Sequence, residues 1–325
     1  MPASLGSPRF AYTRGLHALG DGCYAWLQPD GSWGWSNAGL VVDGGASLLV
    51  DTLFDLRLTR EMLAAMRAAE PRAAARIATL VNTHSNGDHT FGNALVEGAE
   101  IVATRACAEE MAGEGPAALL EFQRRAPGMG RLGEYALHCF GAFRFDDVET
   151  RLPTRTFAGR LDLQVGSKRV ELIQVGPAHT RGDLLAYLPG ERTLFSGDIL
   201  FVDGTPIVWA GPVANWIEAC RRIQELDVET IVPGHGPITD KRGAAAVAGY
   251  LEYVRAEARK RFDAGLSARD AAFDIALGDY ASWGDAERIA VNVATLYREF
   301  SGDEKRANVV ELFELMGELH RQRRR

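Results

Sequence analysis

The chain has 325 residues, enough for one large domain with an appendage or for two domains. Hydrophobic residues make up 46% of the chain and charged residues 24%, as in ordinary globular proteins. The net charge of −7 argues against a nucleic-acid partner, because a protein that binds phosphates usually carries a basic surface.

The N-terminal stretch, residues 1–14, contains no apolar core of signal-peptide length, and no later run approaches a membrane span. The four cysteines are scattered and form no CxxC pair, so we expect them to be reduced and structural. These features predict a cytoplasmic protein without a membrane partner.

Residues 10–53 are typical of antiparallel β-structure, with apolar strands at 38–42 and 46–50 on either side of an Asp-Gly-Gly turn. The loop before these strands carries Trp33 and Trp35. Two interpretations stay open for both rings: packing onto the core, or forming an apolar wall beside a substrate.

The next segment alternates between helix and strand patterns. Apolar residues recur at helical spacing over 58–69, and short strands are predicted at 77–81 and 101–103. This alternation predicts a layered α/β domain.

From residue 109 to about 157 the periodicity weakens; residues 119–123 fit a helix, but Pro and Gly interrupt the pattern at 127–130. An irregular stretch of this length inside a compact domain is typical of a lid or substrate loop. His138 falls here, apart from the other histidine motifs, and we expect it to be a surface or packing residue rather than a ligand.

Regular patterns return in the second half. We predict five strands, at 161–165, 170–175, 184–188, 193–195 and 230–232. We also predict one amphipathic helix, at 216–226.

After residue 240 the composition shifts to Ala, Arg and Glu with helical spacing. We expect four helices, at about 243–263, 267–277, 285–300 and 304–320. We therefore expect two parts of the chain, a first domain at 1–240 and a helical extension at 241–325. We expect the extension to pack on the core or to form an interface with a second copy of the chain.

The most informative stretch is Thr-His-Ser-Asn-Gly-Asp-His, which follows the predicted strand at 77–81. His84, Asp88 and His89 are strong metal-ligand types, with Asn86 between them. A loop at the end of a strand is held rigidly and still faces solvent, as a catalytic metal requires. The alternative is a polar turn with two incidental histidines.

Three further strands end in Gly-containing turns that present a metal-ligand side chain: His179, Asp198 and His235. Only seven histidines occur in the chain, and four of them lie at strand ends of this kind. Chance readily produces one such turn but not four in succession, so the pattern favours a dinuclear metal site.

The order HxxxDH, H, D, H, with its Gly-Asp and Pro-Gly-His-Gly turns, resembles the metallo-β-lactamase superfamily over roughly residues 20–240. The resemblance implies an αββα sandwich with a hydrolytic metal site at one edge. It also implies that His84 and His179 bind a first metal and that Asp88, His89 and His235 bind a second, with Asp198 bridging them.

Asn86 departs from the family pattern HxHxDH, in which a histidine takes its place. An amide oxygen is a weaker ligand than imidazole, so Asn86 is expected to be a weak ligand or none. The resemblance then allows one or two ions. Zinc is the expected metal, and His and Asp ligands also suit iron or manganese.

We therefore expect a metal-dependent hydrolase that opens an ester, lactone, thioester or amide of a small molecule with metal-activated water. Asp88 would orient the water and accept its proton, with Asp51 and Thr83 as supporting partners. Trp33, Trp35 and the 109–157 segment would shape the substrate pocket. The alternatives are an iron-dependent redox or dioxygenase member of the same fold, and a degenerate binding protein without catalysis.

Overall fold

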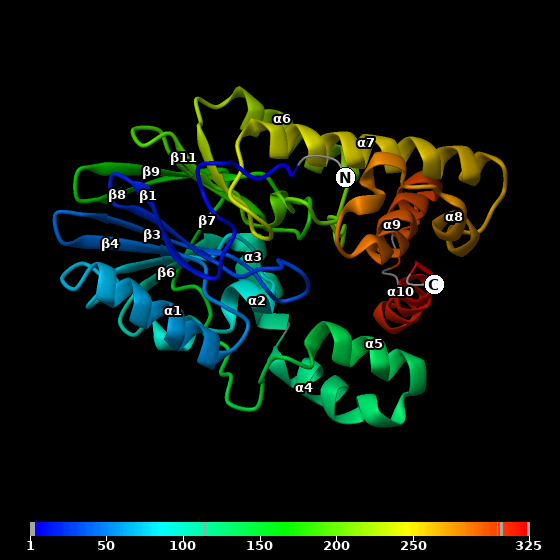
Figure 1. Ribbon diagram of the computed structural model, residues 1–325, viewed down its shortest axis with the longest axis horizontal. Helices are drawn as coiled ribbons and strands as arrows, with labels where there is room; N and C mark the ends of the chain where they lie inside the picture. Colours follow the sequence, from blue (N-terminus) through cyan, green and yellow to red (C-terminus); the bar gives the residue numbers. More distant parts are fainter. Residues whose placement is uncertain (1–3, 114, 304, 306–307, 324–325) are drawn as a thin grey trace.

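The computed structural model describes residues 4–113, 115–303, 305 and 308–323. Two β-sheets lie face to face at one end of the molecule, and the helices after residue 263 gather at the other end (Figure 1). The first sheet follows chain order, with β1 (Gly15–Gly20), β2 (Cys23–Leu27), β3 (Ala38–Asp43), β4 (Ala46–Val50), β5 (Thr79–Val81), β6 (Glu100–Thr104) and β7 (Arg155–Phe157). The second has the order β12 (Thr230–Val232), β11 (Thr193–Phe195), β10 (Leu184–Leu188), β9 (Lys168–Gln174), β8 (Arg160–Val165).

The direction of the strands places several of their carboxyl ends at one edge. In the first sheet, β4 to β7 are parallel to one another. In the second, β10 is antiparallel to both β9 and β11, and β12 is parallel to β11. Strands β9, β11 and β12 therefore run the same way, and the loops that follow them leave the sheet at the same edge.

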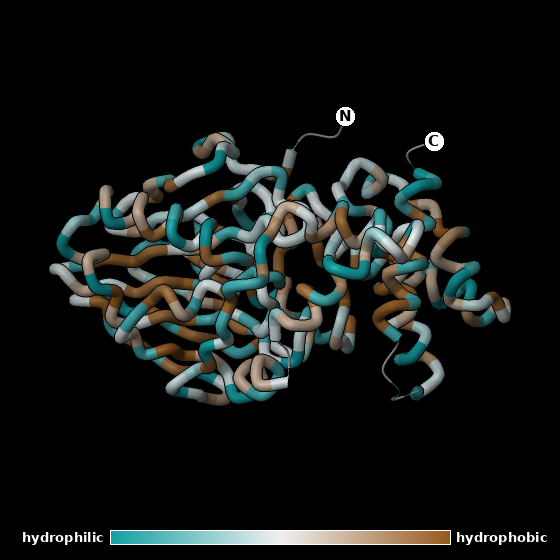
Figure 2. Tube along the Cα trace, turned by 90° about the horizontal axis from the view of Figure 1, so that it is seen from below, coloured by the Kyte–Doolittle hydropathy of each residue, from teal (hydrophilic) through white to brown (hydrophobic). Residues whose placement is uncertain are grey.

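The core of the sandwich lies between the two sheets. All five residues of β10 are buried, because helices cover the face of this sheet that turns away from its partner. Leu184, Ala186 and Leu188 belong to the cluster between the sheets, whereas Leu185 and Tyr187 pack on the outer, helical side. The strands of the sandwich are accordingly the most hydrophobic part of the trace in Figure 2.

Helices cover both outer faces and form the far end of the molecule. Their bounds are α1 (Leu56–Ala69), α2 (Gly87–Thr90), α3 (Arg105–Gly113), α4 (Pro116–Arg125), α5 (Gly130–Phe140), α6 (Val213–Glu225), α7 (Lys241–Asp263), α8 (Ala268–Asp274), α9 (Ile289–Ser301) and α10 (Val309–Arg323). Helix α1 begins where Asp55 Oδ1 accepts a hydrogen bond from Leu58 N at 2.7 Å. The predicted αββα sandwich with a helical extension is confirmed.

The expectation of an irregular segment at 109–157 is wrong over most of its length. It contains the end of α3 and the whole of α4 and α5, and only 141–154 is a long loop before β7. The Gly and Pro residues lie at the junctions between these short helices: Pro116 begins α4, and Pro127 lies in the turn before α5. The same residues that interrupt the sequence pattern therefore separate three regular elements.

The four helices predicted after residue 240 are present as α7 to α10. Helix α10 begins at Val309, and residues 304 and 306–307 of the predicted fourth helix lie outside the described residues. Helix α7 begins where the expected boundary falls and packs along α6 (Figure 1). That the extension is a separate domain stays a prediction.

All four cysteines are free and buried, as expected. Residues 1–3, part of the N-terminal stretch considered above, are not among those described. Within the described part of the chain, no helix combines the length and apolar character needed to cross a bilayer.

Candidate metal centre

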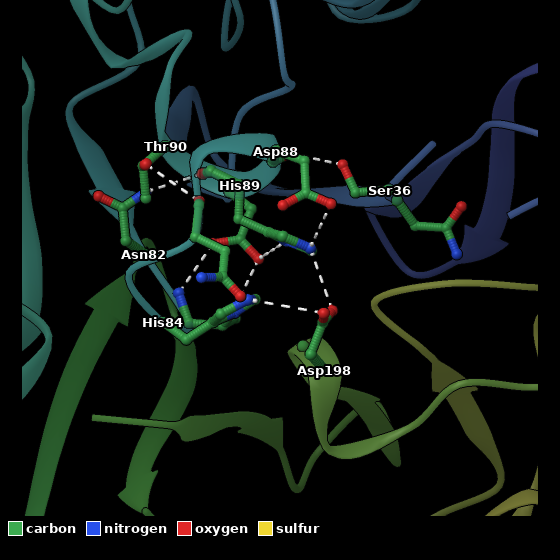
Figure 3. A network of polar contacts seen from close by, with 12 residues as sticks. Ser36, Asn82, His84, Asp88, His89, Thr90 and Asp198 are labelled. Carbon is green, nitrogen blue, oxygen red and sulfur yellow. Dashed lines mark hydrogen bonds and ion pairs between the residues drawn. The ribbon is translucent and has the colours of Figure 1, made fainter. Parts of the chain in front are cut away.

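The predicted ligand residues come together at the edge where the carboxyl ends of the strands meet. The loop after β5 carries His84 and Asn86 and leads into α2, which carries Asp88 and His89. His179, Asp198 and His235 follow β9, β11 and β12, respectively. Residues separated by up to 151 positions thus form one cluster, which Figure 3 shows from close by.

The Asp198 carboxylate lies at the middle of this cluster. Its Oδ2 is 3.6 Å from His84 Nε2, 3.3 Å from His179 Nε2 and 3.5 Å from His235 Nε2. Its Oδ1 is 3.1 Å from His89 Nε2. One carboxylate that touches all four imidazoles has the position expected of a ligand shared by two ions.

Asp88 contacts the side of the cluster formed by His89 and His235. Its Oδ2 lies 3.2 Å from His235 Nε2 and 3.9 Å from His89 Nε2. The ligand atoms of Asp88, His89 and His235 all lie within 4.8 Å of one another, and so do those of His84, His89 and Asp198. Two overlapping groups of three donors are therefore present.

Asp51 and Thr83 support two of the imidazoles, as the sequence predicts. Asp51 occupies the residue after β4, and its Oδ2 accepts a hydrogen bond from His89 Nδ1 at 2.9 Å. The Thr83 hydroxyl donates to the same Oδ2 at 2.7 Å, so it can only accept from His84 Nδ1, 3.0 Å away. These contacts fix the tautomers of His84 and His89.

Backbone carbonyls support the other two imidazoles. His179 Nδ1 donates to the carbonyl of Ile207 at 2.7 Å, and His235 Nδ1 donates to that of Gly31 at 3.0 Å. Sequence patterns gave no signal for either carbonyl, because both lie in loops distant along the chain. With Nδ1 of each ring engaged in this way, all four Nε2 atoms face the centre, where each can bind a cation in place of any proton it carries.

The polar atoms at the centre fit a divalent metal. His84 Nε2, His89 Nε2 and Asp198 Oδ1 are buried and take part in no hydrogen bond with a described residue. His89 Nε2 lies 3.1 Å from Asp198 Oδ1, and the nearby carboxylates raise the pKa of His89, so this position attracts positive charge and a metal ion can take the place of the proton. Neutral imidazoles and carboxylates are also the donor set that such ions take in proteins.

Electrostatics prepare these groups for a cation. Burial lowers the pKa of His84 and of His179, which keeps both rings neutral. Burial acts in the same direction on His89 and His235, but the carboxylates of Asp198 and Asp88 outweigh it, raising the pKa of His89 well above its usual range and that of His235 to about 9. Burial opposes ionisation of Asp88, yet the neighbouring His89 and His235 outweigh it and bring the pKa of this carboxyl to about 2. The pKa of Asp198 is likewise held well below its usual range by the surrounding imidazoles, against the effect of burial.

Asn86 lies inside the cluster although it departs from the pattern. Its Oδ1 is 2.7 Å from His179 Nε2. The amide therefore faces the group of donors that the family pattern gives to the first metal.

A glycine allows the close approach of the last histidine turn. A Cβ at Gly234 would lie 2.0 Å from Asp198 Oδ1, so no other residue fits before His235 without displacing the carboxylate. This explains the Gly in the Pro-Gly-His-Gly sequence.

A cavity of about 780 Å³ opens over the centre, and Asp88, Asp198, His179 and His235 line it. Its walls are mostly aromatic and aliphatic, and the apolar members include Trp33, Phe54, Phe91, Phe140, Leu312 and Phe313. The cavity is thus suited to a small molecule with an apolar group.

The two tryptophans differ in position. Trp33 lines the cavity and is also largely buried, so it packs on the core and also forms part of the apolar wall of the cavity. Trp35 is not among the described residues that line the cavity, and it packs on Phe143 with the ring centroids 4.8 Å apart. Of the two, only Trp33 can contact a molecule in the cavity.

Sequence reasoning missed the helical extension as part of the cavity. Leu312 and Phe313 of α10 and Val291 of α9 lie in its wall. Arg288 also lines it, with its guanidinium 4.5 Å from the Trp33 ring. The helical spacing of these residues predicted burial, but no local signal shows which surface they cover.

A sandwich of two sheets with His and Asp donors gathered at one edge defines a metal-binding αββα protein. Residues 31–235 match the family described as the metallo-beta-lactamase superfamily, and the chain belongs to this family.

Two curated relatives illustrate the range of the family. The chain is 29% identical over 206 residues to the 2,4-dinitroanisole O-demethylase subunit alpha of Nocardioides sp. (strain JS1661), a match that spans 60% of this chain and 51% of that protein. It is 28% identical over 236 residues to the acyl-coenzyme A thioesterase MBLAC2 of Bos taurus, covering 67% of this chain and 79% of the relative. The chain thus spans about half the length of the first relative.

Solved structures share the fold. The sec-alkylsulfatase Pisa1 from Pseudomonas sp. has a TM-score of 0.67 at 16% identity, over 92% of this chain and 52% of that one. A metallo-beta-lactamase from Pontibacter korlensis has a TM-score of 0.57 at 18% identity, over 74% of this chain and 99% of its own.

Proposed function

We propose that the protein is a zinc-dependent hydrolase that opens an ester, lactone, thioester or amide of a small molecule carrying an apolar group. The single observation that carries this proposal is the apolar cavity directly over the cluster of donors, with Asp88, Asp198, His179 and His235 in its lining. An apolar group bound against the aromatic wall would bring the bond beside it to the centre.

Each group of the chain has a role in this reaction. His84 and His179 would hold a first ion, Asp88, His89 and His235 a second, and Asp198 both. When bound, a divalent ion acidifies water and polarises a carbonyl. Asp88 is ionised and lies at the cavity, so it can orient a water molecule and accept its proton.

The relatives guide the choice of substrates. The name of one relative describes an acyl-coenzyme A thioesterase, which supports thioesters as a first class to test. The name of another describes an O-demethylase of an aromatic ether, which makes aryl methyl ethers a useful second class.

The test is a substrate panel with purified protein whose metal content has been measured. We would assay acyl thioesters of increasing chain length, aryl esters, lactones, β-lactams and an aryl methyl ether. We expect hydrolysis of at least one ester, lactone, thioester or amide, lost on treatment with chelator and restored by zinc.

The matched variants are His235→Ala, which removes a proposed ligand, and His17→Ala, which removes an imidazole bonded to the Thr13 carbonyl outside the centre. We expect only His235→Ala to lose metal and most activity. Protein that carries metal and yet hydrolyses nothing in the panel would contradict the proposal. Activity that follows iron and an oxidant instead of zinc would favour the redox alternative.

A further inference from the structure

Helices α5 and α10 cross at very short distance, well away from the sandwich core (Figure 1). A Cβ at Gly317 of α10 would lie only 3.0 Å from Cβ of Tyr135 on α5. The glycine therefore permits the close crossing. One turn further along each helix stand His138 and His320, and their ring centroids are 4.5 Å apart.

A carboxylate completes this cluster. Glu287 lies in the short 3₁₀ helix η5 (Ala286–Arg288), and only 5% of its side chain is exposed. Its Oε1 accepts hydrogen bonds from Tyr135 Oη and from His320 Nδ1, both at 3.1 Å. The ligand atoms of His138, Glu287 and His320 all lie within 4.8 Å of one another.

We propose that His138, Glu287 and His320 form a second zinc site, separate from the candidate metal centre. None of the three lines the cavity over that centre, among the residues that the structure describes. Two imidazoles and one carboxylate, with water as the fourth ligand, are a donor set that zinc takes in proteins.

The geometry needs little adjustment to hold an ion. Ligands about 2.1 Å from a tetrahedral zinc are about 3.4 Å from one another. His320 Nδ1 and Glu287 Oε1 are already 3.1 Å apart, with one proton between them. Zinc would take the place of this proton, as metal binding to imidazole generally does near neutral pH. His138 is exposed on α5, so an ion can reach the site from solvent.

An ion at this site would link helices α5 and α10, which both contribute to the wall of the cavity. Helix α5 carries Phe140 and α10 carries Phe313, and both line the cavity with ring centroids 5.7 Å apart. An ion held by one residue of each helix would fix the distance between these rings. The alternative to a zinc site is a simple ion pair between His320 and Glu287. In that case His138 would not take part in binding.

The experiment counts zinc bound at equilibrium to the full chain. The protein and three variants would be dialysed against a range of free zinc concentrations, and bound zinc would be measured by mass spectrometry. We expect His138→Gln and His320→Gln each to bind one zinc ion fewer than the unmodified protein. His17→Gln, a matched change outside both sites, should bind the unmodified number.

Thermal unfolding in the presence of chelator checks that the variants are folded. If His320→Gln fails to fold because Glu287 loses its partner, His138→Gln carries the test, since its side chain is exposed. Equal numbers of zinc ions in His138→Gln and in the unmodified protein would overturn the proposal and leave the cluster as a packing contact. This count does not depend on whether the protein is a hydrolase.

Discussion

Asn86 Oδ1 lies 2.7 Å from His179 Nε2, inside the cluster of donors, at the position of the second histidine in the HxHxDH pattern. Because His179 Nδ1 donates to Ile207 O, Nε2 is the ring atom that contacts the amide at hydrogen-bond distance, and a metal bound to Nε2 would displace this contact. The amide therefore stands where it can share an ion with His179, although it is a weaker ligand than imidazole.

We predict that the first metal leaves before the second when the protein is titrated with chelator. The first ion would be held by His84, His179 and Asp198, and at most weakly by Asn86. Stepwise metal content, followed by mass spectrometry, measures the order of loss.

Asn86→His is the matched variant, because it restores the usual ligand type. We expect it to retain the first metal at higher chelator concentration, while activity need not rise if the imidazole occupies the place of water or substrate. Simultaneous loss of both metals from the unmodified protein would show that Asn86 is not a weak point.

We predict that Asp51→Asn weakens metal binding by about 10- to 100-fold, the usual effect of removing a carboxylate that supports a ligand imidazole. Asp51 Oδ2 accepts from both His89 Nδ1 and the Thr83 hydroxyl. Asn is the suitable replacement, since Asp51 has a φ of 63° and Asn tolerates this left-handed conformation.

Competition with a coloured chelator measures the affinity of Asp51→Asn for zinc. Asp43→Asn is the control, because Asp43 is only half-buried and bonds to Ser167 at the opposite end of β3 from the turn that follows β2. Equal affinities in the two variants would remove Asp51 from the support of the metal centre.

We predict that Phe313→Ala raises KM for the most apolar substrates by about 10- to 100-fold, with a smaller change in kcat. Loss of a buried aromatic contact is worth about 1.5–3 kcal/mol, and every 1.4 kcal/mol is about tenfold in affinity. Phe313 belongs to the cavity wall and packs on Trp33, with the ring centroids 5.6 Å apart.

Steady-state kinetics on a series of increasing acyl chain length test this prediction. Phe300→Ala removes a half-buried ring of the helical extension that packs on Phe262 instead. A KM that is unchanged in Phe313→Ala, or raised equally in both variants, would argue that the extension stabilises the fold without contacting substrate.

We predict that Gly39→Ala destabilises the protein by about 1–3 kcal/mol, the usual penalty of overpacking a core. Gly39 lies in β3, and a Cβ there would stand 2.1 Å from the ring of Phe195 on β11, in the opposite sheet. The two sheets therefore approach closely at this point.

Unfolding in urea measures the free energy of unfolding. Gly190→Ala is the control, because nothing lies within 4 Å of its added Cβ and its φ is not in the left-handed region. If both variants unfold at the same urea concentration, the approach of the sheets at Gly39 is looser than the structure indicates.

The amino-acid sequence by itself indicated the candidate donors of the metal centre and a layered α/β domain, and the family resemblance added the sandwich. Each donor follows a short apolar strand within a few residues, and a Gly in the turn marks the position. His179 after β9 and His235 after β12 were found in this way, because the strand, the turn and the ligand are all neighbours along the chain.

Only the tertiary structure decided how distant segments meet. Of the short helices in 109–157, the sequence indicated only the middle of α4, because each helix is too short to establish a period and Pro116 and Pro127 separate them. The carbonyls of Gly31 and Ile207 could not be foreseen as partners of His235 and His179, since a backbone carbonyl carries no sequence signal.

The same reason applies to the helical extension. Helical spacing predicted that α10 buries one face, but not that this face would wall the cavity with Phe313 or bring His320 to His138. Hydrophobic burial is not directional. A periodic pattern therefore predicts which residues are buried, but the residues that they contact depend on how the whole chain packs.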